Sequence, residues 1–135
     1  MSLLVDTSVW SLALRRDAPQ PGPEVEALRQ ALLGTDQVLT TGLILQELLQ
    51  GFAGPKNRDV LLHHFTVLAC LQPDRHDHLE AAEVRNACRR CGVQIGTIDA
   101  LLIQLCCRHD ITLLSTDKDF ALAAKTIEFR LWRAS

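Results

Sequence analysis

The stretch Leu3-Leu4-Val5-Asp6-Thr7-Ser8 decides the fold of this chain. An apolar run that is followed by an acid and two hydroxyl side chains is typical of a buried parallel strand that turns into a helix. Ligands of open α/β sheets bind outside the carboxyl ends of the strands, so we expect Asp6 in a crevice at that edge. We therefore place the candidate active site at Asp6.

Strand-like and helix-like segments alternate along the rest of the chain. Further strands are expected at 38–40, 67–70, 112–115 and 127–131. Helices are expected at 7–16, 24–33, 43–52, 57–65, 77–91, 97–109 and 117–124. This alternation predicts an α/β fold, a central parallel sheet with helices on both faces. A length of 135 residues fits one domain, which we expect to span 1–135.

The composition predicts a globular protein of the cytoplasm. Hydrophobic residues make up 47% and charged residues 22%, and no stretch is long and apolar enough for a membrane span. Asp6 interrupts the place where a signal peptide needs an apolar core. The five cysteines are odd in number, which favours reduced thiols over disulfides. Cys88 and Cys91 have C-x-x-C spacing, but no second such pair accompanies them, so we do not expect a metal or redox site there.

The charge of the chain neither requires nor excludes nucleic acid as a partner. A net charge of −2 argues against binding by charge alone. If several acids gather in one pocket, however, the remaining surface is nearly balanced. Of the 14 basic residues, 11 are arginine, whose planar guanidinium suits phosphate groups.

Acids lie at the ends or edges of buried elements in four separate parts of the chain. Asp6 ends the first strand, Glu47 borders the apolar stripe of a helix, and Asp99 lies in the first turn of the most hydrophobic helix, just after Thr97, its expected cap. Asp117 follows a later strand, with Asp119 two residues beyond it. Each acid alone also has an ordinary interpretation as a helix cap, a first-turn acid or an exposed helical residue. Their joint occurrence favours one shared site.

Clustered carboxylates repel one another and take up protons unless a cation shares the site. Oxygen ligands without histidine or cysteine point to Mg²⁺ or Mn²⁺. Such ions polarise a phosphodiester and lower the pKa of a bound water. The residues therefore predict a metal-dependent nuclease.

Four short motifs occur in order over nearly the whole chain. They are Leu3-Leu4-Val5-Asp6-Thr7-Ser8-Val9-Trp10, Glu47-Leu48-x-x-Gly51, Thr97-x-Asp99-Ala100-Leu101-Leu102, and Leu114-Ser115-Thr116-Asp117-x-Asp119-Phe120. Together they resemble the PIN domain, and their spacing resembles the VapC toxins of bacterial toxin–antitoxin pairs.

The resemblance implies a sheet of four or five parallel strands and a Mg²⁺- or Mn²⁺-dependent endoribonuclease that cuts structured RNA such as tRNA or ribosomal RNA. It also implies a homodimer and a small VapB-like antitoxin whose tail covers the active-site groove. Carried over by motif, the metal-binding carboxylates are Asp6, Glu47, Asp99 and Asp117, with Asp119 as an additional, outer member.

The resemblance gives other side chains supporting roles and leaves the choice of RNA open. Thr7 and Thr116 would orient ligands or water, and Ser8 and Ser115 fit equally well as supporting hydroxyls or as local caps. Thr7 or Ser8 is also the expected cap of the first helix. Which of Asp117 and Asp119 is the fourth ligand stays open. The candidates for phosphate contact are Arg15, Arg16, Arg85, Arg89 and Arg90.

Other functions compete with this interpretation. Haloacid-dehalogenase-like phosphatases need a second aspartate where this chain has Ser8, and receiver domains need an aspartate after the third strand, where Cys70-Leu71-Gln72 has none. A nuclease of RNA maturation or quality control would share the same chemistry, and an inactive PIN-like module would only bind a partner. A small antitoxin frame upstream in the genome would favour the toxin.

Overall fold

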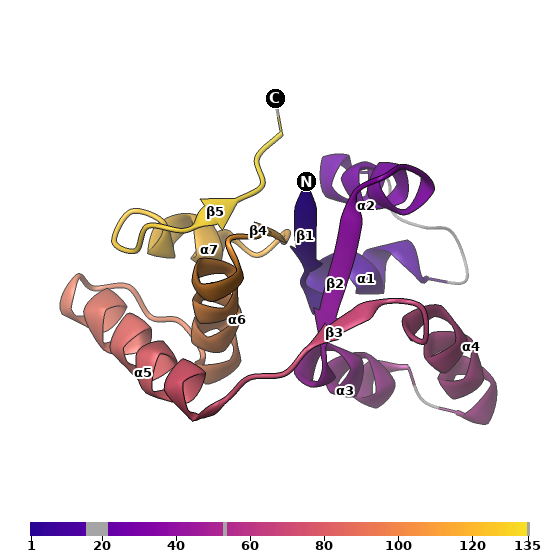
Figure 1. Ribbon diagram of the computed structural model, residues 1–135, viewed down its shortest axis with the longest axis horizontal. Coiled ribbons are helices and arrows are strands. Elements are labelled where there is room, and N and C mark those ends of the chain that lie inside the picture. The colour runs from indigo at the N-terminus through magenta and orange to yellow at the C-terminus, as the bar shows by residue number, and fades with distance from the viewer. Residues whose placement is uncertain (16–21, 53, 135) are drawn as a thin grey trace.

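A five-stranded parallel sheet forms the centre of the protein (Figure 1). The structure, a computed structural model, describes residues 1–15, 22–52 and 54–134. The strands are β1 (Ser2–Val5), β2 (Gln37–Thr41), β3 (Ala69–Leu71), β4 (Thr112–Leu114) and β5 (Arg130–Leu131). Their order is β3-β2-β1-β4-β5, and every neighbouring pair is parallel. The expected α/β fold with a central parallel sheet is confirmed.

Helices cover both faces of this sheet. They are α1 (Thr7–Ala13), α2 (Pro23–Leu33), α3 (Gly42–Gly51), α4 (Pro55–Phe65), α5 (Arg75–Arg90), α6 (Thr97–His109) and α7 (Lys118–Ala123). Figure 1 shows α1 to α4 on one side of the strands and α5 to α7 on the other. The right-handed crossovers of parallel strands require this division, because the chain steps outward through β2 and β3 and then returns past β1 to β4. The strand order thus reverses direction between β1 and β4.

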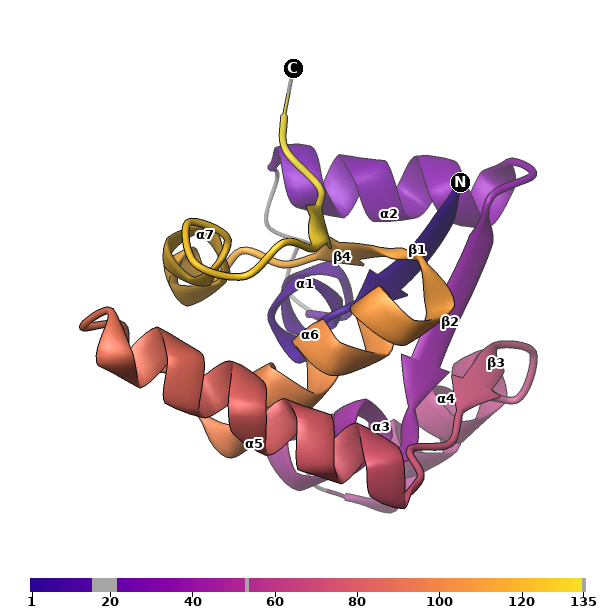
Figure 2. The same ribbon diagram turned by 60° about the vertical axis from the view of Figure 1, so that its left-hand side comes forward.

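The sequences of β1 and α6 are hydrophobic because both elements lie in the core. Leu3, Leu4 and Val5 of β1 are at most 2% exposed, as expected for a central strand that is covered on both faces. In α6, the residues from Ala100 to Cys106 are all buried, because α5 packs along its outer side (Figure 2). These two elements carry Asp6 and Asp99 to the same end of the sheet. None of the helices in the described residues has the length and apolar composition needed to cross a membrane.

Several helix boundaries differ from the sequence prediction. Helices α2 and α4 begin at Pro23 and Pro55, earlier than expected, since proline fits the first turn of a helix, where its missing N–H is not needed. Helix α5 begins at Arg75 rather than at residue 77, because Asp74 and Asp77 form a capping box. Helix α1 already ends at Ala13, so Arg15 lies beyond the helix.

Three strands are shorter than predicted. The strand expected at 112–115 ends at Leu114. The segment expected at 67–70 pairs only as Ala69–Leu71, and Val67 is 83% exposed, so its apolar character does not place it in the sheet. The last strand is Arg130–Leu131 rather than 127–131, because the N–H of Ile127 still bonds to the carbonyl of Ala123 in the turn after α7.

Candidate metal centre

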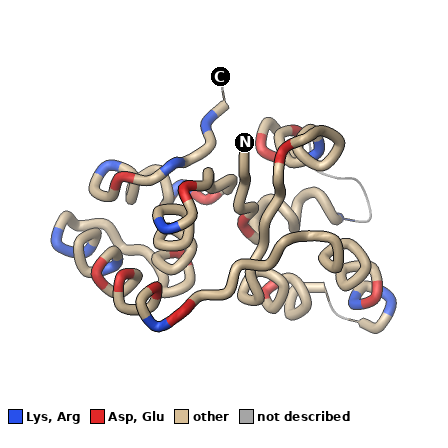
Figure 3. The backbone as a smooth tube through the Cα atoms, viewed as in Figure 1, with Lys and Arg blue, Asp and Glu red and all other residues tan. Residues whose placement is uncertain are grey.

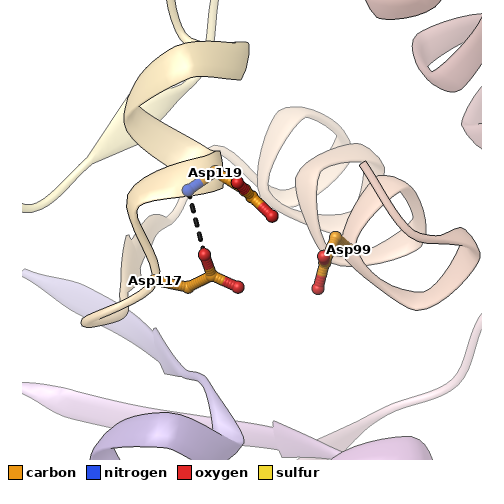
Figure 4. A group of neighbouring side chains, drawn as sticks. All are labelled: Asp99, Asp117 and Asp119. Carbon is orange, nitrogen blue, oxygen red and sulfur yellow. Dashed lines mark hydrogen bonds between the residues drawn. The ribbon is translucent and has the colours of Figure 1, made fainter. Parts of the chain in front are cut away.

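Three carboxylates lie close together at the carboxyl end of the sheet (Figure 4). One oxygen atom each of Asp99, Asp117 and Asp119 lies within 4.8 Å of the other two. Asp99 comes from the first turn of α6, Asp117 is the N-cap residue of α7, and Asp119 belongs to the first turn of α7. Within the described residues, no other group of three or more His, Cys, Asp or Glu side chains meets this criterion. We call these residues the three-acid group.

The start of α7 fixes the two acids of the last motif. The N–H of Asp119 donates to Oδ1 of Asp117 at 2.9 Å, and the N–H of Asp117 donates to Oγ of Ser115 at 3.0 Å. Asp117 therefore caps its helix and also faces Asp99, so the two interpretations of this residue are compatible.

Asp6 lies at the end of β1 and is only 7% exposed. It occupies the N-cap position of α1, but its side chain makes no capping hydrogen bond. Its Oδ2 instead accepts hydrogen bonds from Oγ of Ser115 at 2.8 Å and from Oγ of Ser8 at 3.0 Å. The N–H of Asp6 donates to the carbonyl of Leu114 at 2.9 Å. The ends of β1 and β4 are thus joined by backbone and side chain at the point where the strand order reverses.

Glu47 lies half-buried in the middle of α3, outside the three-acid group. Its Oε1 accepts a hydrogen bond from Oγ1 of Thr7 at 2.8 Å. Because Thr7 follows Asp6 directly, this bond connects α3 to the end of β1. Glu47 is therefore attached to the site through Thr7.

The electrostatics of Asp99 reflect this crowding. Burial raises the pKa of Asp99 to about 6, and the negative charges of Asp6, Asp117 and Asp119 act in the same direction. A hydrogen bond from the backbone of Gly96 opposes the shift. No ion pair among the described residues involves these acids or Glu47. A set of hard oxygen donors with uncompensated negative charge fits a divalent cation such as Mg²⁺ or Mn²⁺.

The expected caps are occupied differently. Gly96, not Thr97, is the N-cap of α6. The hydroxyls of Thr7 and Ser8 do not cap α1, because they bond to Glu47 and Asp6. Thr116 is exposed, and its backbone N–H donates to Oγ of Ser8 at 3.1 Å.

The candidate RNA-contact arginines lie in different places. Arg85, Arg89 and Arg90 are on α5, and Arg15 is exposed after α1. Arg16 lies outside the described residues.

All cysteines are free thiols, and Cys88 is buried while Cys91 is exposed. The sequence does not reveal a groove beside Asp99, because its lining residues come from three separate helices, and only Thr97, Ala100 and Leu101 belong to one of the four motifs.

Comparison with known proteins identifies the family of the chain. The family model of the PIN domain matches residues 3–126. Comparison with curated protein sequences gives no match.

Solved structures resemble the chain over nearly its whole length. One is VapBC2 from Rickettsia felis bound to a promoter DNA fragment, with a TM-score of 0.76, 16% identity and 100% of both chains covered. VapBC-1 from nontypeable Haemophilus influenzae has a TM-score of 0.74 and 17% identity, covering 98% of this chain and 97% of that one. VapC20 of Mycobacterium tuberculosis, a toxin that cleaves the sarcin–ricin loop, has a TM-score of 0.65 and 22% identity, covering 95% of this chain and 98% of that one. These structures share the fold, and the family model identifies the chain as a member of the PIN domain family.

Proposed function

We propose that this protein is a divalent-metal-dependent endoribonuclease of the VapC type, the toxin of a toxin–antitoxin pair. The observation that carries the proposal is the three-acid group, whose carboxylates lie within 4.8 Å of one another and have no cationic partner among the described residues. Membership of the PIN domain family supports a nuclease. The shared fold of VapC20, which cleaves an RNA loop, supports RNA as the substrate.

Asp99, Asp117 and Asp119 would hold the metal ion, with Asp6 beside them. When bound, Mg²⁺ or Mn²⁺ would polarise the phosphodiester and lower the pKa of the attacking water. One carboxylate oxygen of Asp119 lies within 4.8 Å of the oxygens of both Asp99 and Asp117. This proximity supports Asp119 as a metal ligand alongside Asp117.

The remaining residues of the site orient these acids. Ser8 and Ser115 both donate to Oδ2 of Asp6, which leaves its Oδ1 without a hydrogen bond from any described residue and available for a ligand. Thr7 donates to one oxygen of Glu47 and so fixes the direction of the other. Hydroxyl donors on ligand carboxylates are the usual means by which proteins orient such sites.

The partners follow from the same proposal. We expect a structured RNA substrate such as tRNA or ribosomal RNA, a VapB-like antitoxin and a homodimer. We expect the protein to act in the cytoplasm, where free thiols persist. The likeness to VapBC complexes supports the antitoxin. Arg15, Arg85, Arg89 and Arg90 are the described candidates for phosphate contact.

The test is cleavage of labelled tRNA and structured RNA by the purified protein with Mg²⁺, with Mn²⁺ or with EDTA. Asp99→Asn is the test variant. Asp59→Asn, an exposed acid on α4, is the charge-matched control. Discrete cuts that need the metal, vanish in Asp99→Asn and persist in Asp59→Asn support the nuclease. A folded protein that binds metal and cuts none of these RNAs would favour the inactive binding module.

A second measurement separates the toxin from an RNA-maturation enzyme of the same chemistry. Induced expression of the toxin should arrest growth, and co-expression of a small neighbouring frame should restore it. Growth that continues during expression of an active nuclease would contradict the toxin assignment.

A further inference from the structure

A groove with a volume of about 340 Å³ lies between α5, α6 and the start of α3. Thr97 and Ile98 line it, and the next residue is Asp99 of the three-acid group. Leu43 lines it from α3, one helical turn before Glu47 and on the same face of that helix. The groove therefore adjoins the turns of α6 and α3 that carry candidate metal-site acids.

The lining combines apolar walls with a few polar groups. The walls come from Leu43, Ala81, Ala82, Ile98, Ala100 and Leu101. Arg85, Asn86, Thr97 and His78 add the polar groups, and none of the described lining residues is acidic. Pockets that bind small organic groups have this composition, and their volumes begin at roughly 300 Å³.

Arg85 is held in place by the backbone that leads into α6. Its Nε donates to the carbonyl of Ile95 at 2.9 Å, and its side chain is half-buried. Its two terminal nitrogens bond to no described residue. A guanidinium that is fixed at Nε keeps its flat face and its remaining donors for a ligand.

We propose that this groove binds one unstacked base of the RNA, next to the phosphodiester at the acids; this inference rests on the proposed nuclease function. Proteins recognise single-stranded RNA by stacking splayed bases on histidine or arginine planes and by hydrogen bonds to the base edges. His78 and Arg85 supply such planes. The amide of Asn86 offers a donor and an acceptor, which allows one base to be preferred over the others.

The charges around the groove favour RNA over a protein partner. Arg85 lies in the groove, and Arg89 and Arg90 form the last turn of the same helix, where Figure 3 shows basic residues at the end of α5. A polyanion that reaches the groove from this end of α5 meets these three arginines before it reaches the acids of α6 and α7. The groove thus determines which nucleotide lies beside the cut.

The test titrates the ¹⁵N-labelled full chain with each of the four ribonucleoside 5′-monophosphates in EDTA and follows the amide signals of Asn86, Thr97 and Ile98 by NMR. One nucleotide should shift these signals and bind roughly tenfold more tightly than the weakest, the size expected for hydrogen-bonded discrimination of bases. Ala82→Trp, which fills the groove from an exposed position, should abolish this binding. Glu83→Trp, on α5 but outside the groove lining, should retain it.

Three results would overturn the proposal. The first is the absence of any shift at the groove. The second is equal binding of all four nucleotides that survives Ala82→Trp. In the third, the groove signals depend on protein concentration and not on nucleotide, which would indicate a second copy of the chain as the occupant. The titration requires no cleavage, so the two proposals can fail separately. Metal-dependent RNA cleavage without nucleotide binding in the groove would reject only the base-binding proposal. Absence of both cleavage and nucleotide binding would reject the proposed nuclease function as well.

Discussion

Asp77 of α5 and the three-acid group of α6 and α7 differ in how their negative charge is compensated. Asp77 is 0% exposed, yet it has partners on every side. It accepts from the N–H of Asp74 at 2.9 Å and from Nε2 of Gln104 at 3.3 Å, and it is paired with Arg108. Burial raises its pKa, but these hydrogen bonds and the charge of Arg108 together hold the pKa below its usual value.

Asp99 is less buried than Asp77, and its pKa is nevertheless raised, to about 6. Burial acts on both residues, so the difference comes from their neighbours, which are donors and a cation around Asp77 and further acids around Asp99. An acid whose charge is balanced inside the chain stabilises the fold. An acid left among other acids is favoured by a bound proton or by a cation from solution, as the proposed metal site requires.

The largest expected effect is on activity. Asp99→Asn should lower metal-dependent RNA cleavage by more than about a hundredfold, because loss of even an outer partner of a metal ligand costs roughly 10- to 100-fold. The folded structure should persist, since the change removes a repulsive charge. Parallel cleavage assays and thermal melts in EDTA check both statements. Loss of folding in EDTA would place Asp99 with Asp77 as a structural acid.

The next largest effect is on stability. Asp77→Ala should lower the free energy of unfolding by about 2–3 kcal/mol, because it leaves Gln104 and Arg108 without their partner. Urea titration measures this change. Arg108 is 38% exposed and can turn to solvent, which keeps the loss below that of a fully buried pair. A wild-type midpoint of unfolding in Asp77→Ala would mean that the two acid groups do not differ as described.

The contrast between the groups also explains what the sequence could predict. The sequence predicts Asp6, Asp99 and Asp117 as candidate site residues because each lies at the boundary of a buried apolar segment, and such boundaries are visible in the sequence. The partners of Asp77 could not be found in this way, because Gln104 and Arg108 meet it only after α5 packs on α6. The same holds for the groove, whose residues join three helices. Strand ends such as Val67 were misassigned because apolar character alone does not show whether a strand has a partner.

The dependence of stability on pH should differ between wild type and Asp99→Asn. The ordinary pKa of an aspartate is 3.8 and that of Asp99 in the folded protein is about 6, so the folded protein binds more protons between these values. Its stability in EDTA should therefore fall as the pH rises from about 4 to about 6, by about 1–2 kcal/mol after screening by solvent.

Urea midpoints measured across this pH range check the prediction, with Asp99→Asn as the control that removes the titration. Added Mg²⁺ should restore stability above pH 6 in the wild type and less so in the variant. Parallel pH curves for the two proteins in EDTA would contradict the raised pKa.

The charge of Asp6 is compensated less than that of Asp77 and more than that of Asp99. Hydroxyl groups donate to one of its oxygens, while its negative charge still raises the pKa of Asp99. Ser115→Ala breaks the bond to Asp6 and also removes the acceptor of the N–H of Asp117. It should still give the smallest effect, a loss of about 1 kcal/mol in stability, since Ser8 continues to donate to the same oxygen of Asp6. Unfolding titrations of this variant and of Ser11→Ala, whose hydroxyl on α1 bonds to no described side chain, would separate the effect of the Ser115 bond from the loss of any serine. Equal losses in both variants would mean that the Ser115 bond does not support Asp6.

The link between Asp6 and Ser115 joins residues 109 positions apart, and it has a consequence for the synthesis of the protein. During translation, β1 emerges well before its neighbour β4 and the acids of α7. Until β4 and α7 dock on β1, the carboxylate of Asp6 lies apart from the three-acid group. Asp6 and the three-acid group therefore come together only after α7 has been translated.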